Sequence, residues 1–557
     1  MRNIKVFTAL ALALLLASCA ISPTRNRMSD GPEPVKNVIF LLTDGTGPEA
    51  WPLARWVKGS PLAVDEILTG AIRTYGADSI ITDSAPGATA YATGHKGSDK
   101  GISVAPWNIT IAGVNADPAL AYIPLATLLE GARISGRATG LVASSNIQHA
   151  TPAAFSAHWH DRSNYNELGE QQVYQNIDVV LGGGKQYLLP KEKDGGKRED
   201  KEDLITELKM MGYGFVDTRE DMLSAKSGKL WGAFAPDAMA YDIDRLVTAP
   251  TEPSLSEMTA KAIDLLSASP KAQKTGFFLF VEGSKIDWAA HANDPSGLVY
   301  DLLAFDAAVK TALDFAKKDK DTLLIVVSDH GTGGITIGTK DDKNYSLTDD
   351  DYLVAPMRKI KLTGEGIDKL IAGDTSEAKI KRIVSDNWGI TDLTDEEMAT
   401  IIDAMHKRIA LNKILGPMLS KRARLDWTTG GHTGADVFLF SYGPGHPVGL
   451  IENTALGHYM ASAMGFNIRS LNQELFVEAG KAFSDFGCQA VIDKSDPTNP
   501  IILVTKGDLS ATIPLAKNLI RVNKKILRFN GIAVHAEKLS KAYLPPKAVE
   551  MTVAELK

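Results

Sequence analysis

The sequence predicts an α/β fold with a central, mostly parallel sheet flanked by helices on both faces. Apolar runs of strand length, such as 37–43 and 322–328, are hydrophobic over most of their length, as expected of strands buried on both faces. A segment with helical periodicity, 298–318, directly precedes the second of these runs. Several runs end in polar side chains, and ligand sites in open α/β sheets lie beyond the carboxyl ends of the strands. These observations place a candidate site at one edge of the sheet.

Length and composition are those of an ordinary globular protein. The chain has 557 residues, of which 44% are hydrophobic and 23% are charged. This length suggests more than one domain, or one large α/β enzyme with insertions. Lys and Arg number 60 and Asp and Glu number 67, which gives a formal net charge of -7. That balance argues against nucleic-acid binding.

The N-terminus predicts export. Residues 1–18 combine a basic start with an apolar run, 6–16, that is too short to span a bilayer, which is typical of a signal peptide. The run leads into Leu-Ala-Ser-Cys, which resembles the bacterial lipobox and predicts lipidation of Cys19. Residues 19–36 would then be a flexible tether, and the protein would be a membrane-anchored lipoprotein of the periplasm or cell surface. Secretion with an incidental cysteine is the alternative. Lipidation would leave Cys488, the second cysteine, without a disulfide partner.

The stretch 82–91 holds a candidate nucleophile, Ser84. This serine follows Asp83 and precedes small residues that lead into a helix. The pattern places a hydroxyl at a helix N-terminus, where free N–H groups and the helix dipole attract anions. A serine hydroxyl is a poor nucleophile unless a base or a metal takes its proton. The rest of the chain must therefore supply an activator.

Two predicted strands end in metal-ligand residue types. Asp44 follows the strand 37–43 and precedes a glycine, which lets the backbone turn closely. Asp329 and His330 follow the strand 322–328 and provide an oxygen and an imidazole, both of which bind zinc. An acid in a glycine-rich turn is by itself more often structural. Each of these motifs alone is therefore weak evidence for a metal site, and only their combination is informative.

Further ligand types lie between and after these strands. Asp287 and His291 are four residues apart, so on a helix they share one face and converge on one ion. Glu282 ends the apolar run 276–281, and His432 lies among small residues. After another predicted strand come His149 and Thr151.

These motifs resemble the alkaline phosphatase family across about residues 36–470, both in their order along the chain and in the residues that each contains. The most specific part is Asp83-Ser84-Ala85, followed by Thr89-Ala90-Tyr91 and Thr93-Gly94. The supporting parts are Asp44-Gly45, Ala150-Thr151-Pro152 with Arg162, Val281-Glu282-Gly283 with Asp287 and His291, Asp329-His330, and His432-Thr433-Gly434.

The resemblance implies that the chain binds two zinc ions and one magnesium ion. One zinc would be held by Asp287, His291 and His432. The second would be held by Asp44, Asp329 and His330, with Ser84 as its reactive ligand. The magnesium would be held by Asp44, Thr151 and Glu282. These donor sets agree with the preferences of the ions, since nitrogen-bearing sets suit zinc and all-oxygen sets suit magnesium.

The resemblance also implies hydrolysis of phosphate monoesters through a covalent phosphoserine at Ser84. Arg162 would offer its planar fork to two non-bridging phosphate oxygens, which a monoester leaves free and a diester does not. Asp83 would hold the guanidinium of Arg162 in the orientation that binds the phosphate. The alternatives are a phosphodiesterase or sulfatase of the same superfamily, and a catalytically silent surface binding protein. Family members are often dimers, so a homodimer stays open for this chain.

Two positions depart from the pattern of the best-known bacterial members. His149 stands where those proteins carry Asp, and Trp288 stands where they carry Lys. Both positions would modulate the site, His149 through the metal preference of the third position and Trp288 through phosphate affinity. Since Trp288 removes a cation near the product, we expect weaker inhibition by phosphate than in a Lys-bearing relative.

The expected domain organisation follows the resemblance. Residues 37–486 would form the catalytic domain, with 185–255 and 335–426 as insertions or cap regions. Residues 487–557 alternate short β-prone runs with turn residues and predict a small β-rich appendage.

Overall fold

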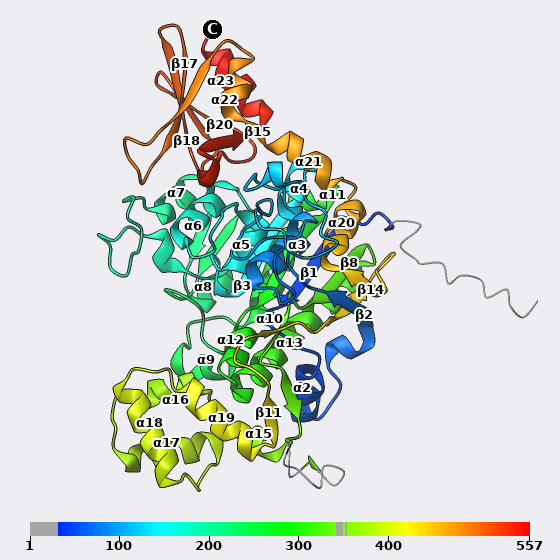
Figure 1. Ribbon diagram of the computed structural model, residues 1–557, viewed down its shortest axis with the longest axis vertical. Helices are drawn as coiled ribbons and strands as arrows, with labels where there is room; N and C mark the ends of the chain where they lie inside the picture. The colour runs from blue at the N-terminus through cyan, green and yellow to red at the C-terminus, as the bar shows by residue number, and fades with distance from the viewer. Residues whose placement is uncertain (1–31, 227, 341–348, 351–353) are drawn as a thin grey trace, which may run out of the picture.

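A ten-stranded sheet forms the centre of the molecule in a computed structural model that describes residues 32–557 apart from 227, 341–348 and 351–353 (Figure 1). The strand order is β14-β2-β13-β8-β1-β7-β3-β4-β6-β5. Within this sheet β13 runs antiparallel to both of its neighbours, and the other neighbouring strands are parallel. The mostly parallel sheet predicted from the sequence is therefore confirmed. The strands are β1 (Asn37–Thr43), β2 (Leu68–Arg73), β3 (Ala138–Asn146), β4 (Val179–Gly183), β5 (Gly214–Val216), β6 (Leu230–Ala233), β7 (Phe277–Gly283), β8 (Thr322–Val327), β13 (Val437–Tyr442) and β14 (Gly449–Glu452).

The predicted signal peptide 1–18 and Cys19 lie outside the described residues. Within the described part of the chain, no helix combines the length and the apolar character that crossing a bilayer requires. The thiol of Cys488 is buried and forms no disulfide there.

The segment 185–255 differs from the expected insertion, because it contributes β5 and β6 to one edge of the main sheet. β6 is buried over all four of its residues. The sequence pattern did not reveal these strands, since they are short and lie among charged, exposed segments. The helices of this segment are α7 (Leu204–Met210), α8 (Arg219–Ser224) and α9 (Asp242–Thr248).

The segment 335–426 forms a group of helices at one end of the molecule (yellow-green in Figure 1). It is closed at its base by the antiparallel pair β10 (Ile335–Ile337) and β11 (Leu425–Trp427). The described helices are α15 (Ala355–Arg358), α16 (Gly364–Ile371), α17 (Glu377–Trp388), α18 (Asp395–His406) and α19 (Asn412–Arg422).

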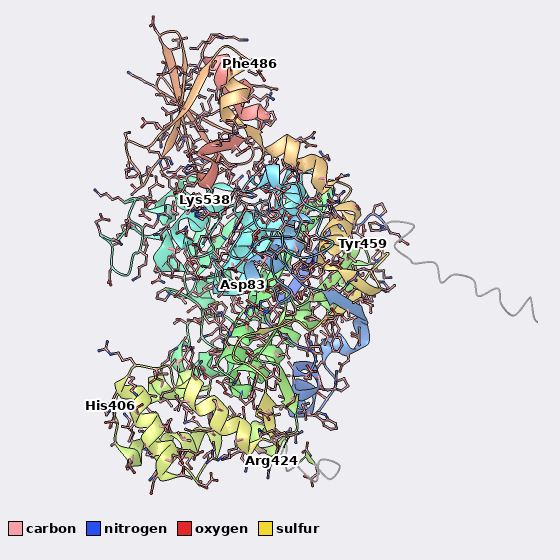
Figure 2. All side chains as sticks on the ribbon, viewed as in Figure 1. Asp83, His406, Arg424, Tyr459, Phe486 and Lys538 are labelled. Carbon is pink, nitrogen blue, oxygen red and sulfur yellow. The ribbon has the colours of Figure 1, made fainter. Side chains whose placement is uncertain are left out.

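The C-terminal part is a separate β-rich unit at the opposite end, with Asp83 between the two ends (Figure 2). Its five-stranded antiparallel sheet confirms the predicted β-rich character. The unit begins before residue 487, because β15 (Val477–Glu478) pairs with β22 and α22 (Ala479–Ser484) packs into the core of the unit. The other elements are β16 (Gln489–Asp493), β17 (Ile501–Lys506), β18 (Leu509–Pro514), β19 (Leu519–Val522), β20 (Lys525–Arg528), β21 (Val534–Ala536), β22 (Lys541–Leu544) and α23 (Pro546–Glu555).

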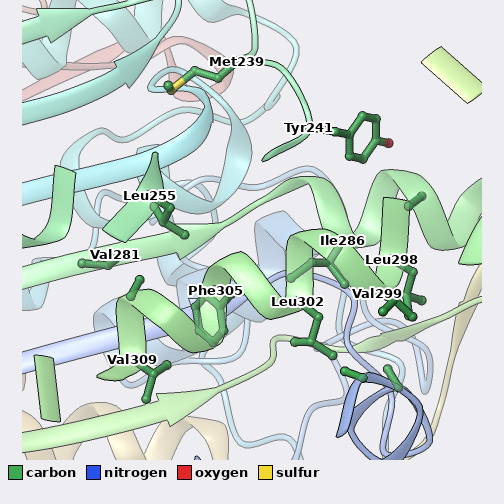
Figure 3. Close-up of a cluster of buried hydrophobic side chains, with 14 of the residues drawn as sticks. Met239, Tyr241, Leu255, Val281, Ile286, Leu298, Val299, Leu302, Phe305 and Val309 are labelled. Carbon is green, nitrogen blue, oxygen red and sulfur yellow. The ribbon is translucent and has the colours of Figure 1, made fainter. Parts of the chain in front are cut away.

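Helices cover both faces of the main sheet, because alternate residues of its strands face opposite sides. In β1, Ile39 and Leu41 face one core, whereas Val38, Phe40 and Leu42 face the other. The first core includes side chains of the long helix α13, such as Leu302 and Phe305 (Figure 3). The helices of the first core include α2 (Ala50–Lys58), α10 (Leu255–Ser267) and α13 (Pro295–Asp319), and those of the second include α3 (Ser84–Thr93), α4 (Leu128–Ile134), α5 (Ala150–Ser156) and α20 (Asn453–Ala463).

Candidate metal centre and serine

Ser84 is the first residue of helix α3, and Asp83 is its N-cap. The side chain is 2% exposed, and its Oγ lies 3.3 Å from Nε2 of His330. The hydroxyl thus lies at a helix N-terminus, as the sequence predicts, where backbone N–H groups favour an anion.

Asp287, His291 and His432 come together at the carboxyl edge of the sheet. Asp287 and His291 lie on one face of α12 (Lys285–His291), as predicted from their spacing. His432 belongs to β12 (His432–Thr433), which pairs with β9 (Gly331–Thr332) directly after His330. The Nε2 atoms of His291 and His432 lie 3.0 Å apart, and Asp287 Oδ2 lies 3.4 Å from Nε2 of His291.

Both imidazoles are held in the tautomer that binds metals through Nε2. Nδ1 of His291 donates to the carbonyl of Gly430 at 2.7 Å, and Nδ1 of His432 donates to the carbonyl of Thr82 at 2.9 Å. A neutral ring that donates from Nδ1 carries a lone pair on Nε2. Two such lone pairs face each other, an arrangement that a shared cation stabilises.

Asp44, Asp329 and His330 form a second group, fully buried beside Ser84. Nε2 of His330 lies 3.4 Å from Asp329 Oδ2 and 3.6 Å from Asp44 Oδ1. Asp329 Oδ2 and both carboxylate oxygens of Asp44 have no hydrogen-bond partner in the described part of the chain. Buried charges without partners are costly unless they are paired or coordinate a metal, so this group fits a divalent cation.

Thr332 joins the two groups and was not identified from the sequence. Its hydroxyl donates to Asp287 Oδ1 at 2.6 Å and lies 3.2 Å from Nδ1 of His330. The contact leaves Nε2 of His330 facing Ser84 and the carboxylates. Gly45 permits the close approach of the two groups, because it has φ +67° and a Cβ there would lie 2.5 Å from Asp287 Oδ1. The only sequence signal for Thr332 is its position two residues after His330.

Asp44 also faces a third group, with Glu282 and His149. The hydroxyl of Thr151, both carboxylate oxygens of Glu282 and Nδ1 of His149 are buried without a hydrogen-bond partner among the described residues. The oxygens expected from the sequence therefore converge here. His149 was expected only to modulate the site, but one of its ring nitrogens lies within 4.8 Å of carboxylate oxygens of Asp44 and Glu282.

The electrostatics of the three groups also favour cations. Burial, followed by the charges of Asp329 and Asp287, raises the pKa of Asp44 well above its usual range. Burial raises the pKa of Asp329 to about 7 and that of Glu282 to about 8. Burial and the neighbouring His432 lower the pKa of His330 to about 3. Without a cation these carboxylates resist ionisation, whereas a divalent cation would offset the burial of their charges.

Arg162 lies at the rim of the site in a fixed orientation. Its Nη1 donates to both carboxylate oxygens of Asp83 at 2.7 and 2.6 Å, and its Nη2 lies 3.1 Å from Nε2 of His149. Burial raises the pKa of Asp83, but the charge and hydrogen bonds of Arg162 outweigh this effect and lower it to about 2. Trp288 completes this region, with its ring 5.6 Å from that of His149.

A serine at a helix N-terminus, ringed by carboxylates and imidazoles at the carboxyl edge of a parallel sheet, defines a metal-dependent hydrolase. Comparison with known proteins agrees with this class. The family model described as alkaline phosphatase matches residues 35–466. Alkaline phosphatase 3 of Bacillus subtilis (strain 168) is 35% identical over 486 residues, which are 84% of this chain and 97% of that protein.

Two solved structures extend the comparison. The crystal structure of Thermus thermophilus alkaline phosphatase is 26% identical with a TM-score of 0.69, and the match covers 80% of this chain and 95% of that one. A TAB5 alkaline phosphatase variant, with glutamate in place of a histidine, has magnesium bound in its M3 site; it is 26% identical with a TM-score of 0.56 and covers 78% of this chain and 99% of that one. This chain belongs to the alkaline phosphatase family and is a hydrolase.

Proposed function

We propose that the chain hydrolyses phosphate monoesters through a covalent phosphoserine at Ser84. The observation that carries this proposal is the position of the Ser84 hydroxyl, 3.3 Å from Nε2 of His330 at the start of α3. The hydroxyl lies among buried carboxylates and imidazoles that a bound cation would complete.

The metal ligands would be those expected from the sequence. Asp287, His291 and His432 would hold one zinc ion, and Asp44, Asp329 and His330 a second, beside Ser84. Asp44, Thr151 and Glu282 would hold magnesium, since their donors are all oxygens. When bound, these ions lower the pKa of the Ser84 hydroxyl and neutralise charge that develops on the ester oxygens.

The protein's own residues then bind the ester and direct the reaction. Arg162 binds two non-bridging oxygens of the phosphate, held in position by Asp83. The Ser84 Oγ gives its proton to solvent and attacks phosphorus opposite the ester oxygen. The bond from phosphorus to the ester oxygen breaks, and this oxygen takes a proton from water as the alcohol departs. Water then hydrolyses the phosphoserine, which releases inorganic phosphate and restores the hydroxyl. The N-terminus of α3 favours the anionic phosphate throughout.

Turnover on three aryl substrates tests this proposal. A phosphate monoester, a phosphate diester and a sulfate ester of the same phenol are compared, with Ser84→Ala as the variant. We expect the monoester to be hydrolysed fastest, and Ser84→Ala to lose that activity while it retains its metals. Faster turnover of the diester or the sulfate would favour the other branches of the superfamily.

We also propose that the protein is exported and anchored through a lipid on Cys19. The apolar run and the Leu-Ala-Ser-Cys sequence support this proposal. Labelling with a radioactive or clickable fatty acid in a bacterial host should mark the wild type and not Cys19→Ser. Label on both proteins, or on neither, would contradict the proposal.

A further inference from the structure

A cleft of about 790 Å³ lies between the start of helix α6 (Tyr165–Tyr174) and the C-terminal unit. On the catalytic side its lining begins at Ser163 and Asn164, which directly follow Arg162. On the other side Pro497, Thr498 and Glu537 line it. The C-terminal unit therefore forms one wall of a cleft that starts next to the arginine of the site.

Aromatic contacts connect the cleft to the catalytic centre. The ring of Tyr165 lies 6.5 Å from that of His149, which contacts Arg162, and 5.0 Å from that of Tyr187. Tyr165 and Tyr187 both line the cleft. The lining of the cleft therefore lies one aromatic ring beyond His149, the residue that contacts Arg162.

The wall formed by the C-terminal unit is fixed to the catalytic domain. Lys517 forms ion pairs with Glu170, at 3.1 Å, and with Glu202. Asn518 Nδ2 donates to the carbonyl of Tyr174 at 2.9 Å. Figure 2 shows Lys538 where the unit meets the catalytic domain. Ion pairs and a hydrogen bond therefore hold together the two parts of the chain that line the cleft.

Carboxylates dominate the charged lining of this cleft. Three of them have a cationic partner, because Arg198 pairs with Glu170 and Asp200, and Lys191 pairs with Glu199. The charged residues of the lining are Glu167, Glu170, Glu199, Asp200, Glu537 and Arg198. This surplus of negative charge disfavours a second phosphate and favours a cation.

Glu167 and Glu537 have no lysine or arginine within ion-pair distance among the residues described. Glu167 accepts a hydrogen bond from Gln171 Nε2 at 3.4 Å, and burial and the neighbouring Glu170 raise its pKa to about 8. Glu537 lies 3.5 Å from Nε2 of His160, whose pKa is lowered by burial. A cationic ligand would supply the partner that both carboxylates lack.

Trp159 adds an aromatic ring to the lining. Its side chain is 8% exposed, and its indole N–H has no hydrogen-bond acceptor within the described ranges. With Tyr165 and Tyr187 it gives the cleft aromatic surface, on which cations and organic groups pack favourably.

We propose that this cleft binds the alcohol part of the phosphate monoester and favours an alcohol that carries an ammonium group. The inference rests on the proposed function of Ser84 and Arg162, and it assigns the C-terminal unit a role in substrate choice. The carboxylates of Glu167 and Glu537 would attract the ammonium group, and the aromatic residues would contact its carbon chain.

The test compares 6-aminohexyl phosphate with 6-hydroxyhexyl phosphate on the full chain. These esters match in length and differ in charge, and at about pH 9 a primary amine with a pKa of about 10.4 is still charged. For the wild type we expect kcat/KM for the amino ester to exceed that for the hydroxy ester by about five- to tenfold at low salt. High salt should reduce this ratio because the carboxylates are near the surface.

The variants Glu167→Gln and Glu537→Gln, made together, should bring the ratio of the two kcat/KM values close to one. Glu474→Gln, an exposed carboxylate outside the cleft, should keep the wild-type ratio. A wild-type ratio near one, or an unchanged ratio in the double variant, overturns the inference while hydrolysis of the hydroxy ester still supports the proposed function. Failure of the wild type to hydrolyse either ester overturns both.

Discussion

Nε2 of His291 and Nε2 of His432 lie 3.0 Å apart, and each ring donates its other N–H to a backbone carbonyl. The two lone pairs point at one position, which Asp287 also approaches. This relationship links residues 141 positions apart in the sequence. The geometry of the three side chains fits a cation shared by the two imidazoles and the carboxylate.

Removal of metal should therefore weaken the fold as well as the activity. After chelation, the buried carboxylates of Asp44, Asp329 and Glu282 lose the charges that would offset their burial. We expect loss of activity and a lower midpoint of thermal unfolding, both restored by zinc and magnesium. Calorimetry of the chelated and reloaded protein checks this. An unchanged midpoint in protein shown to be metal-free would contradict it.

Arg162→Lys should impair the reaction although the charge is kept. Lysine has no planar fork and cannot hold the contacts with both Asp83 and a phosphate. We expect kcat/KM for an aryl phosphate to fall by roughly a hundredfold, with the midpoint of thermal unfolding little changed. Steady-state kinetics provide the measurement, and a fall of less than about twofold would rule out a role for the guanidinium fork.

His149→Glu should increase the affinity for magnesium. The substitution adds a carboxylate beside Asp44 and Glu282 and removes a ring whose Nε2 faces Arg162. We expect magnesium to bind at least about tenfold more tightly. Calorimetric titration of the zinc-loaded protein measures this affinity, with His149→Gln as the uncharged control. Equal magnesium affinity in His149→Glu and His149→Gln would show that the added carboxylate does not contribute to magnesium binding at the third group.

Trp288→Lys should strengthen inhibition by phosphate, because it returns a cation to the product side. The effect expected for a partly exposed charge is about three- to tenfold on the inhibition constant. Trp288→Phe serves as the uncharged control and should leave the constant near its wild-type value. Unchanged or weaker inhibition by Trp288→Lys would refute this expectation.

Glu257 should contribute to stability in a pH-dependent way. It caps α10 by accepting from the backbone of Ser254 at 2.9 Å, and it pairs with Arg219. Burial opposes ionisation of Glu257, but these contacts outweigh burial and lower its pKa from the usual 4.5 to about 2. Because the folded-state pKa is the lower one, the contribution is complete above about pH 4.5 and is lost as the pH falls toward 2.

Urea unfolding of Glu257→Gln checks this prediction. Near neutral pH the variant should be less stable than the wild type by about 1 kcal/mol, and the difference should shrink in acid. Glu220→Gln, beside Arg219 in α8, is the matched control and should cost less than about 0.5 kcal/mol. A difference that persists unchanged in acid would show that the charge of Glu257 is not its source.

The sequence predicted the elements that carry the site because their patterns are local. The run 37–43 coincides with β1, and the run 322–328 extends one residue beyond β8. The four-residue spacing of Asp287 and His291 predicted their shared face on α12. β5 and β6 escaped prediction because strands of three and four residues carry too few positions to show a pattern.

Contacts between distant segments could not be predicted from local pattern. The hydroxyl of Thr332 contacts both Asp287 and His330, and this role can be recognised only when the pairing of β9 with β12 is known. The wall that Glu537 adds to the cleft depends in the same way on the docking of the C-terminal unit. Strand order and domain contacts are set by the packing of apolar surface over the whole chain, which no short window of sequence contains.

Trapping of the phosphorylated protein tests the central proposal most directly. The metal-loaded enzyme is mixed with an aryl phosphate, quenched in acid and digested, and the peptide that contains Ser84 is analysed by mass spectrometry. The account predicts one phosphate on Ser84 in the wild type and none in Ser84→Ala. Phosphate on another residue, or rapid turnover by Ser84→Ala, would contradict it.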